Sequence, residues 1–362
     1  MTAAADAGGA PGPVRPFTAR VVRQEWAARA VTPMVDALHL QRDRPSVDLP
    51  PSAYSPATRA VYVYRIRRAG TDHVGVVADV ALRSFAEGRV RGHEAVEPHR
   101  VDALVSVYAD QPGRAEPVAL LHGCGASFAA RVDDVVRGEP LLDFAGPDGL
   151  EHTLWQVHAE PQAAGLLAPL GEGVHYVADG HHRVAARLRA WDTAGHPADA
   201  GVLCVLYPLD GLALSSFHRR VVGPVDGDAL LAAAATRFTV TATTGPSGTD
   251  GVDLYVAGRW HHLAVGAERA HGVAGLDVTL LQDRLLGPAL GIDGPGDPRL
   301  EVHPDHVALD ALVARCDADG GALFLLRPPA LRALTEVADL GQVMPPKSTY
   351  FAPKPCAGIF QL

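Results

Sequence analysis

The chain has 362 residues, 48% of them hydrophobic, with a formal net charge of −9 and a pI near 6.0. This length predicts two domains, or one large domain with an appended lobe, and the apolar content is sufficient for a sizeable core. Because the chain is acidic and has no block of five or more Lys or Arg, it lacks the electrostatic footprint of a nucleic-acid partner.

Targeting segments and cysteines bear on the compartment, and both favour a reduced, cytoplasmic protein. No stretch reaches the roughly 18 apolar residues that a membrane span needs, so no membrane partner is expected. Residues 1–14 are rich in Ala, Gly and Pro, lack the basic start and apolar core of a signal peptide, and are expected to form a disordered lead. The cysteines are far apart and include no Cys-x-x-Cys pair, which argues against a zinc site and against a disulfide framework.

The first half of the chain predicts strands mixed with helices. Residues 59–68 and 74–82 indicate two antiparallel strands around a turn at residues 70–72. A helix is expected after His99. The apolar run 203–213 indicates a buried strand.

The second half continues in the same mixed way. Residues 226–238 predict a helix followed by a short strand, and segment 245–251 is the clearest loop in the chain. Further elements are expected as a hairpin of strands 252–256 and 261–265, helices 278–289, 306–316 and 329–340, and strands 300–303 and 322–326. Short hairpins among helical crossovers favour an α+β fold, with mixed or antiparallel sheets and flanking helices, over a doubly wound sheet. We expect one domain over residues 15–245 and a C-terminal α+β lobe over residues 252–362.

Polar chemistry is concentrated in the run of residues 177–186, which reads VADGHHRVAA. Residues 174–178 alternate as a half-buried strand would, and Val184, Leu188 and Trp191 then recur at the spacing of one helix face. The run therefore predicts a strand, a tight turn and a helix.

The residues at this turn suit an anion. Gly180 supplies the backbone freedom that the turn needs, and the amides of the first helical turn point back over Asp179. His181, His182 and the planar fork of Arg183 can add positive charge for phosphate or carboxylate oxygens. Asp179 could cap the helix, hold a magnesium ion or take a proton from a hydroxyl. The alternative is that Asp179 is only a cap and both histidines are partly exposed turn residues.

A second candidate is Glu94, which follows His93 in a Gly-rich loop after the strand at 74–82. A glutamate there could be the base that deprotonates a substrate hydroxyl. The alternative is a solvated surface charge.

A third candidate is the proline-stiffened segment near the C-terminus. Lys347, Ser348, Thr349 and Lys354 offer two ammonium groups and two hydroxyls in a segment that cannot be helical, which suits a phosphate clamp. The alternative is a tail whose lysines face water.

Three weaker signals lie elsewhere in the chain. Arg219, in the run 217–220, could lend a cation to a site or only brace it. Residues 122–127 are Gly-rich but lack the Walker lysine, so a loop or helix start with a small buried cysteine is expected. The pair His261 and His262 lies on a predicted strand, where alternation places one ring inside and one outside and argues against a metal pair.

The chain resembles the bacterial and archaeal domain-of-unknown-function family 1015. Members typically carry an Asp-Gly-His-His-Arg segment, found here at residues 179–183, and a Met-Pro-Pro-Lys-Ser-Thr-Tyr-Phe segment, found at residues 344–351. Other blocks follow in the family's order, so the resemblance runs from about Phe17 to the C-terminus. Two departures stand out: residues 31–37 lack the family's tyrosine, and residues 95–104 lack its Pro-Lys pair.

The family is similar, by its histidine-bearing motif, to the ParB and sulfiredoxin superfamily. That superfamily includes kinases of free serine, CTP-binding proteins and ATP-dependent sulfiredoxins. The resemblance implies nucleotide phosphate chemistry, and a ParB/sulfiredoxin-like core carrying the motif of residues 179–183. By analogy with the serine kinases, it favours Glu94 over Asp179 as the base.

The leading hypothesis is a small-molecule kinase that uses ATP or ADP with Mg²⁺ to phosphorylate free serine or a similar hydroxy amino acid. Its expected catalytic residues are Glu94, Asp179 and His182, with Asp179 also as metal ligand. Nucleotide would be bound by Gly180, His181, His182, Arg183, Lys347, Ser348, Thr349 and Lys354, and substrate by His93, Arg219 and Tyr350. The alternatives are a nucleotide-binding switch without net transfer and a phosphate-ester hydrolase. The oligomeric state is left open, with a homodimer as one option.

Overall fold

The computed structural model describes residues 12–32, 49–111, 113, 115–266 and 269–362. These residues form two compact units. Unit 1 takes its described residues from Met1–Gly92, Val96–Leu212 and Pro353–Leu362, and unit 2 comprises His93–Ala95 and the described part of Ala213–Ala352. The strongest sequence segments are thus divided between the units, with residues 179–183 and Lys354 in unit 1 and residues 344–350 in unit 2.

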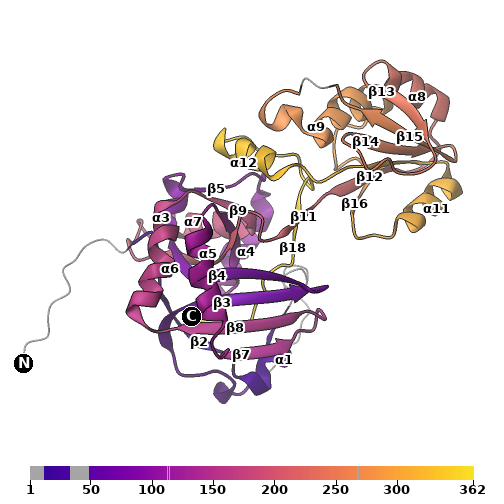
Figure 1. Cartoon of the computed structure of the whole chain (residues 1–362). Coiled ribbons are helices and arrows are strands. Elements are labelled where there is room, and N and C mark those ends of the chain that lie inside the picture. The colour runs from indigo at the N-terminus through magenta and orange to yellow at the C-terminus, as the bar shows by residue number, and fades with distance from the viewer. Residues whose placement is uncertain (1–11, 33–48, 112, 114, 267–268) are drawn as a thin grey trace, which may run out of the picture. The chain divides into compact units, whose positions relative to one another are not determined.

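Unit 1 is built on a mixed sheet of eleven strands (Figure 1). Its main path runs β19-β2-β3-β4-β10-β6-β9-β5, where β3 and β4 form an antiparallel hairpin, β10 and β6 are parallel, and β6 and β9 are antiparallel. The strands are β1 (Val14–Arg15), β2 (Phe17–Val21), β3 (Thr58–Arg68), β4 (Thr71–Ala81), β5 (Val90–Arg91), β6 (Val118–His122), β7 (Leu142–Ala145), β8 (Glu151–Val157), β9 (His175–Asp179), β10 (Gly201–Pro208) and β19 (Phe360–Gln361).

The helices of unit 1 complete its core. They are α1 (Ala27–Ala30), α3 (Leu82–Ala86), α4 (Pro98–Asp110), α5 (Ala126–Val136), α6 (Glu160–Glu172) and α7 (His181–Thr193), with 3-10 turns at Gln24–Trp26 and Pro51–Ala53. Leu166 of α6 and Val184 of α7 pack with Leu120 and Leu206 of the central strands in one apolar cluster. A smaller cluster joins α4 to α7 through Leu104. The packing of α7 against the central strands therefore fixes the position of its N-terminus.

Unit 2 contains an antiparallel sheet in the order β13-β15-β14-β17-β12-β16 and a separate two-stranded ribbon of β11 and β18. The strands are β11 (Ala213–Ser215), β12 (Phe217–Val221), β13 (Thr239–Thr243), β14 (Val252–Val256), β15 (Arg259–Ala264), β16 (Leu300–Pro304), β17 (Ala322–Leu325) and β18 (Tyr350–Ala352). The helices are α8 (Gly227–Ala235), α9 (Asp277–Leu281), α10 (Gly287–Leu290), α11 (Leu309–Asp319) and α12 (Leu331–Asp339), with a 3-10 turn at Gly272–Gly275.

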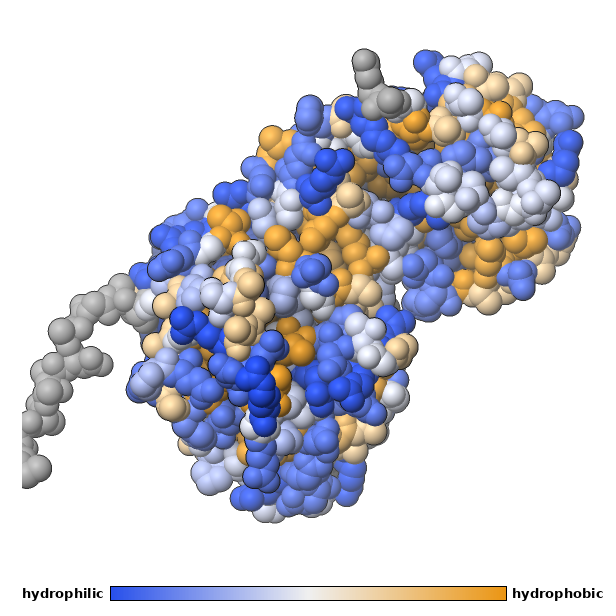
Figure 2. All heavy atoms as spheres, viewed as in Figure 1, coloured by the Kyte–Doolittle hydropathy of each residue, from blue (hydrophilic) through white to orange (hydrophobic). Residues whose placement is uncertain are grey.

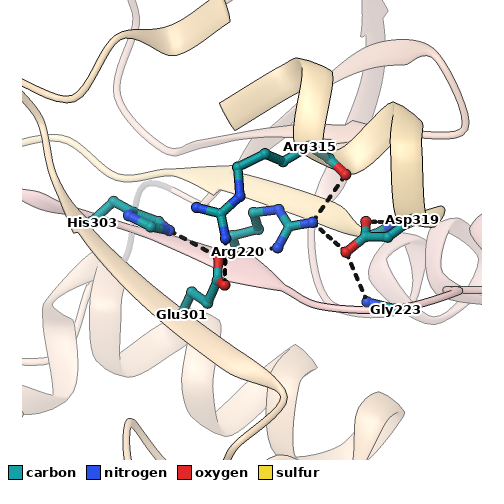
Figure 3. A network of polar contacts seen from close by, with 7 residues as sticks. Arg220, Gly223, Glu301, His303, Arg315 and Asp319 are labelled. Carbon is teal, nitrogen blue, oxygen red and sulfur yellow. Dashed lines mark hydrogen bonds and ion pairs between the residues drawn. The ribbon is translucent and has the colours of Figure 1, made fainter. Parts of the chain in front are cut away.

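A buried arginine ties together three elements of unit 2. Figure 3 shows Arg220 of β12 between Glu301 of β16 and Asp319 of α11, with Arg315 and His303 around the same glutamate. The Arg220 side chain is 2% exposed, and its Nη1 lies 3.0 Å from Glu301 Oε2. This arginine therefore has a structural role, because its charge is neutralised within the fold.

The α+β class expected from the sequence is confirmed, and the predicted hairpins are present as β3 with β4 and β14 with β15. The helix expected over 278–289 is instead α9, a π-helical turn at Gln282–Leu286, and α10. Within the described ranges, no helix has both the length and the apolar character to cross a membrane. On the visible face, hydrophilic residues predominate and apolar residues gather in smaller patches (Figure 2).

The structure differs from some of the predictions. The expectation of one buried and one exposed ring at His261 and His262 is wrong: the two residues are only 8% and 9% exposed, so both faces of β15 are covered at these positions. Loop 245–251, where the sequence suggests a lobe boundary, connects β13 to β14 inside unit 2. The division into a domain over residues 15–245 and a lobe over residues 252–362 stays a prediction. Residues 1–11 of the expected lead and 33–37 of the altered family segment lie outside the described residues.

Candidate functional site

The predicted strand, turn and helix are present as β9, Gly180 and α7. Gly180 is the N-cap of α7, with φ of 109° and ψ of 24°, a left-handed conformation that favours glycine. The amide of Val184 makes the first intrahelical hydrogen bond, to Gly180 O at 3.0 Å. The preceding amides of the first turn have no acceptor within the helix, so this turn presents N–H groups and the positive end of the helix dipole.

The packing of the Arg183 side chain also requires glycine at position 180. A Cβ atom at this position would lie 2.9 Å from Nη2 and 3.0 Å from Cζ of Arg183. The Arg183 side chain is almost fully buried and lies flat against the turn. Both the backbone angle and the packing of the guanidinium therefore exclude a larger residue.

The Asp179 carboxylate is held between two cations. Its Oδ2 accepts a hydrogen bond from Arg183, and its Oδ1 accepts one from Lys354. Burial acts to raise the pKa of Asp179, but the charges of Lys354 and Arg183 outweigh it and lower the pKa to about 2. Asp179 is therefore ionised at neutral pH and is a poor proton acceptor.

This geometry decides between the roles that the sequence left open for Asp179. No side chain caps α7, so the interpretation of Asp179 as a helix cap is wrong. Both carboxylate oxygens already contact cations, and among the described side chains no cluster of potential metal ligands includes Asp179. The arrangement therefore does not fit a role of Asp179 as a magnesium ligand.

The Arg183 guanidinium retains one unused donor. Its Nη1 donates to Pro117 O and its Nη2 to Asp179, but its Nε is buried without a hydrogen-bond partner. A buried donor without an acceptor costs about 1–3 kcal/mol, more for a charged group. An anion or a water molecule at this point would satisfy it.

The two histidines of the motif take different positions. His181 is 7% exposed and packs against Gly92, where a Cβ atom would lie 3.0 Å from the His181 ring. His182 is half-buried, and its Nε2 accepts the Glu97 amide at 3.0 Å. Since Glu97 is the N-cap of α4, His182 joins the starts of α4 and α7. The alternative of two partly exposed turn residues does not hold for His181, which is buried.

Lys354 comes to this cluster from the far end of the chain. Its side chain is 18% exposed and lies 175 residues from Asp179 in sequence. Lys347 and Lys354 are the only lysines in the sequence, in which every other basic residue of the Lys and Arg class is arginine. That rarity is a signal in the sequence that marks both lysines, and Lys354 is the one that reaches Asp179. We call Asp179, Arg183 and Lys354 the α7 cluster.

The remaining predicted residues lie in unit 2. His93 is 1% exposed, and its Nε2 lies 3.2 Å from Thr349 Oγ1. Glu94 is exposed and forms an isolated parallel bridge with Met344. Arg219 is 3% exposed and donates to Lys347 O at 2.9 Å, and burial lowers the pKa of Arg219 to about 10. Arg219 thus braces the backbone of the proline-rich segment.

Internal bonds engage much of that segment. The Ser348 hydroxyl donates to Pro345 O at 2.5 Å, and Lys347 has a positive φ of 57° with its Nζ 5.6 Å from the centre of the Phe217 ring. Tyr350 belongs to β18, and its ring lies 6.0 Å from that of Phe217. The role of these residues in nucleotide or substrate binding stays a prediction.

A cavity of about 370 Å³ in unit 2 was not foreseen from the sequence. Ser216, Phe217, Met344 and Ser348 contribute to its wall. Its charged lining residues are Asp250, Arg269, Asp277, Arg327, Arg332 and Glu336. They come from separate loops and helices, so no local pattern reveals them.

The described residues form an α+β protein in which the N-terminus of α7 lies beside two ion pairs, from Asp179 to Arg183 and to Lys354. The family model described as "Protein of unknown function (DUF1015)" matches residues 55–279, which is more than half of the chain. The chain belongs to this family. No curated protein matches it.

Solved structures with a similar fold are distant. SbnI with a C-terminal truncation from Staphylococcus aureus has 12% identity and a TM-score of 0.43, covering 77% of this chain and 84% of that chain. A mutant of a free serine kinase in complex with AMP has 13% identity and a TM-score of 0.42, covering 88% and 97%. A conserved hypothetical protein from Pyrococcus furiosus has 12% identity and a TM-score of 0.37, covering 78% and 93%. Likeness of this degree assigns no ligand or activity to the chain.

Proposed function

We propose that the chain is a phosphotransferase that binds a nucleotide phosphate at the N-terminus of α7 and transfers a phosphoryl group to the hydroxyl of a free amino acid. The observation that carries the proposal is the α7 cluster. A buried arginine with an unused Nε and the ammonium of Lys354 lie at the first turn of a 13-residue helix. Helix N-termini combined with such cations are suited to phosphate oxygens.

The charges of the α7 cluster favour an incoming anion. Arg183 and Lys354 carry two positive charges against the single negative charge of Asp179. A phosphate group bears more negative charge than a carboxylate, so it can replace Asp179 as the ion-pair partner of Lys354. Asp179 then keeps its hydrogen bond from Arg183. In this scheme Asp179 positions the guanidinium and transfers no proton.

The cavity of unit 2 has charges that suit a free amino acid. Its wall carries three arginines and three acidic residues, and a free amino acid likewise carries one carboxylate and one ammonium group. Several of these charges are already paired, as Arg269 with Asp277 at 2.6 Å, so the cavity offers both signs without a strong net field. The choice of a hydroxy amino acid follows the sequence resemblance to enzymes that phosphorylate free serine.

Glu94 is the proposed base. Its bridge partner Met344 lines the cavity of unit 2, which brings the Glu94 backbone to the cavity wall. In the proposed step the substrate hydroxyl oxygen forms a bond to the transferred phosphorus, the bond from that phosphorus to the nucleotide breaks, and the hydroxyl proton passes to the Glu94 carboxylate.

Phosphorus NMR tests the proposal. The protein is incubated with Mg²⁺, ATP or ADP, and a pool of free hydroxy amino acids, and a new phosphomonoester signal is expected. Lys354→Met should lose the signal and bind nucleotide more weakly, whereas Glu94→Gln should lose the signal and still bind. Arg137→Gln is the matched control, because it removes a paired cation of unit 1 whose side chain is 70% exposed.

The opposite results are equally informative. Free phosphate as the only product would make the chain a hydrolase. Intact nucleotide that still raises the melting temperature would make it a nucleotide-binding switch. No nucleotide binding in the wild type, or unchanged binding in Lys354→Met, would refute the assignment of the phosphate site.

A further inference from the structure

Three side chains of unit 1 bring metal-binding atoms together, two of them four residues apart and the third 204 residues further along the chain. Ligand atoms of Asp148, His152 and Cys356 all lie within 4.8 Å of one another. His152 Nε2 is 3.2 Å from Asp148 Oδ1 and 3.8 Å from Cys356 Sγ, and that sulfur is 3.9 Å from Asp148 Oδ2. His152 and Cys356 are almost completely buried, and the Asp148 side chain is 17% exposed.

These separations fit the edges of a tetrahedral coordination site. With bonds of about 2.3 Å to sulfur and about 2.0–2.2 Å to nitrogen and oxygen, neighbouring ligand atoms around a zinc ion lie about 3.4–3.6 Å apart. The observed spacings of 3.2, 3.8 and 3.9 Å differ from these values by only a few tenths of an ångström. Small side-chain shifts would therefore allow all three atoms to contact one ion.

The His152 ring is held in the orientation that such an ion requires. Its Nδ1 lies 2.7 Å from the buried hydroxyl of Tyr64, and the ring stacks against those of Tyr64 and Phe144 at 5.9 and 5.2 Å. Metal-bound histidines commonly donate their other ring N–H to a polar partner that fixes the tautomer. With Nδ1–H donating to Tyr64 Oη, the Nε2 lone pair faces Asp148 and Cys356.

The loop between β7 and β8 is shaped to deliver the carboxylate. A Cβ atom on Gly146 would lie 2.5 Å from Asp148 Oδ1 and 2.6 Å from His152 Nε2. Only glycine at this position lets the loop close over the imidazole. The Gly149 amide donates to Gly146 O at 3.0 Å, which closes the turn that holds Asp148.

We infer that Asp148, His152 and Cys356 bind a divalent transition-metal ion of the zinc class, which fastens the C-terminal segment to the β7–β8 hairpin. A set of thiolate, imidazole and carboxylate suits zinc and disfavours magnesium and calcium. Water would complete the fourth position. Metal binding releases the proton of the Cys356 thiol to solvent, so affinity increases with pH.

The inferred metal site has a consequence for the α7 cluster. Cys356 lies two residues beyond Lys354, and strand β19 pairs with β2 a few residues later. The ion would thus fix the position of the C-terminal segment, which places the Lys354 ammonium beside the Asp179 carboxylate. Metal binding itself does not depend on the proposed phosphotransferase function.

Cobalt spectroscopy tests the inference. The protein is treated with a chelator, dialysed and titrated with Co²⁺, and we expect a thiolate-to-cobalt absorption band that saturates at one equivalent and disappears on addition of Zn²⁺. Cys356→Ser should abolish the band, while Cys124→Ser, a change at a cysteine outside the cluster, should retain it. Asp148→Asn, a substitution in a partly exposed turn, should weaken binding at least about tenfold.

A second readout is thermal stability. One equivalent of Zn²⁺ should raise the melting temperature of the wild type and have little effect on Cys356→Ser. Absence of the sulfur band in folded wild-type protein, or equal Co²⁺ affinity in wild type and Cys356→Ser, would overturn the inference. Because these readouts involve no nucleotide, they do not change if the proposed phosphotransferase function is refuted.

Discussion

Replacing Asp179 with Asn probes the electrostatics of the α7 cluster most directly. The pKa of this buried carboxyl is lowered from 3.8 to about 2, and at about 1.4 kcal/mol for each unit of pKa this corresponds to about 2 kcal/mol of stability at neutral pH. The substitution also leaves the buried guanidinium of Arg183 without its carboxylate, and breaking a buried pair costs about 3–5 kcal/mol. We therefore expect Asp179→Asn to lose about 2–5 kcal/mol.

The pH dependence has a definite sign. Because the folded-state pKa is below the ordinary value, the contribution of Asp179 is complete above about pH 4 and is lost as the pH falls towards 2. With these two pKa values, about half of the 2 kcal/mol remains at pH 3. The difference between wild type and variant should shrink accordingly.

Urea unfolding at pH 7, 4 and 3 measures this difference. Asp134→Asn is the control, since its exposed pair with Arg137 should contribute less than about 1 kcal/mol. Inorganic phosphate should stabilise Asp179→Asn more than wild type, because the two remaining cations lack their carboxylate. A loss below about 1 kcal/mol, or a difference independent of pH, would refute the ion-pair reasoning, and equal stabilisation by phosphate would refute the anion site.

Three further results are expected. Gly180→Ala should lose more stability than Gly70→Ala in urea unfolding, because both glycines have a positive φ but only Gly180 lies against a side chain, and equal losses would contradict this packing. Arg220→Met should cost about 1–3 kcal/mol by removing its charged hydrogen bonds to Asp319 and to Glu301, which keeps Arg315, yet leave nucleotide binding intact, and loss of binding in a folded variant would contradict a purely structural role. In mass-spectrometric amine labelling, nucleotide should protect Lys354, and unchanged labelling would argue against its contact with phosphate.

Much of the candidate site could be predicted because its pattern is local. The alternation before Gly180, the glycine itself and the helical spacing after it identify a strand, a turn and a helix within about twenty residues, and β9 and α7 are found there. The hairpin of β3 and β4 follows from the same kind of local signal. Such patterns succeed because the spacing of apolar side chains and the turn residues reflect the local backbone geometry.

The chemical state of Asp179 could not be predicted in this way. Capping, metal binding and proton transfer all suit an aspartate before a helix, and its neighbours in sequence do not distinguish them. The choice depends on Lys354, which lies 175 residues away. Burial and two nearby cations then oppose each other in shifting the pKa of Asp179, and their balance is a property of the folded structure.

The cysteines illustrate the same limit. Their wide spacing argues against a zinc site when only neighbouring positions are compared, yet Cys356 lies 3.8 Å from a histidine 204 residues earlier. His261 and His262 were expected on opposite sides of a half-exposed strand, but both residues are buried, because the fold covers both faces of β15.

The family, the α+β class and the polar turn at the start of α7 follow from the sequence alone, because each depends on motifs or on periodicity between near neighbours. The ionised state of Asp179 between Arg183 and Lys354, and the small volume shared by Asp148, His152 and Cys356, became known from the folded structure. The physical reason is that ionisation and metal binding depend on distances of a few ångströms between side chains, and these distances are set when separate segments pack around a common core.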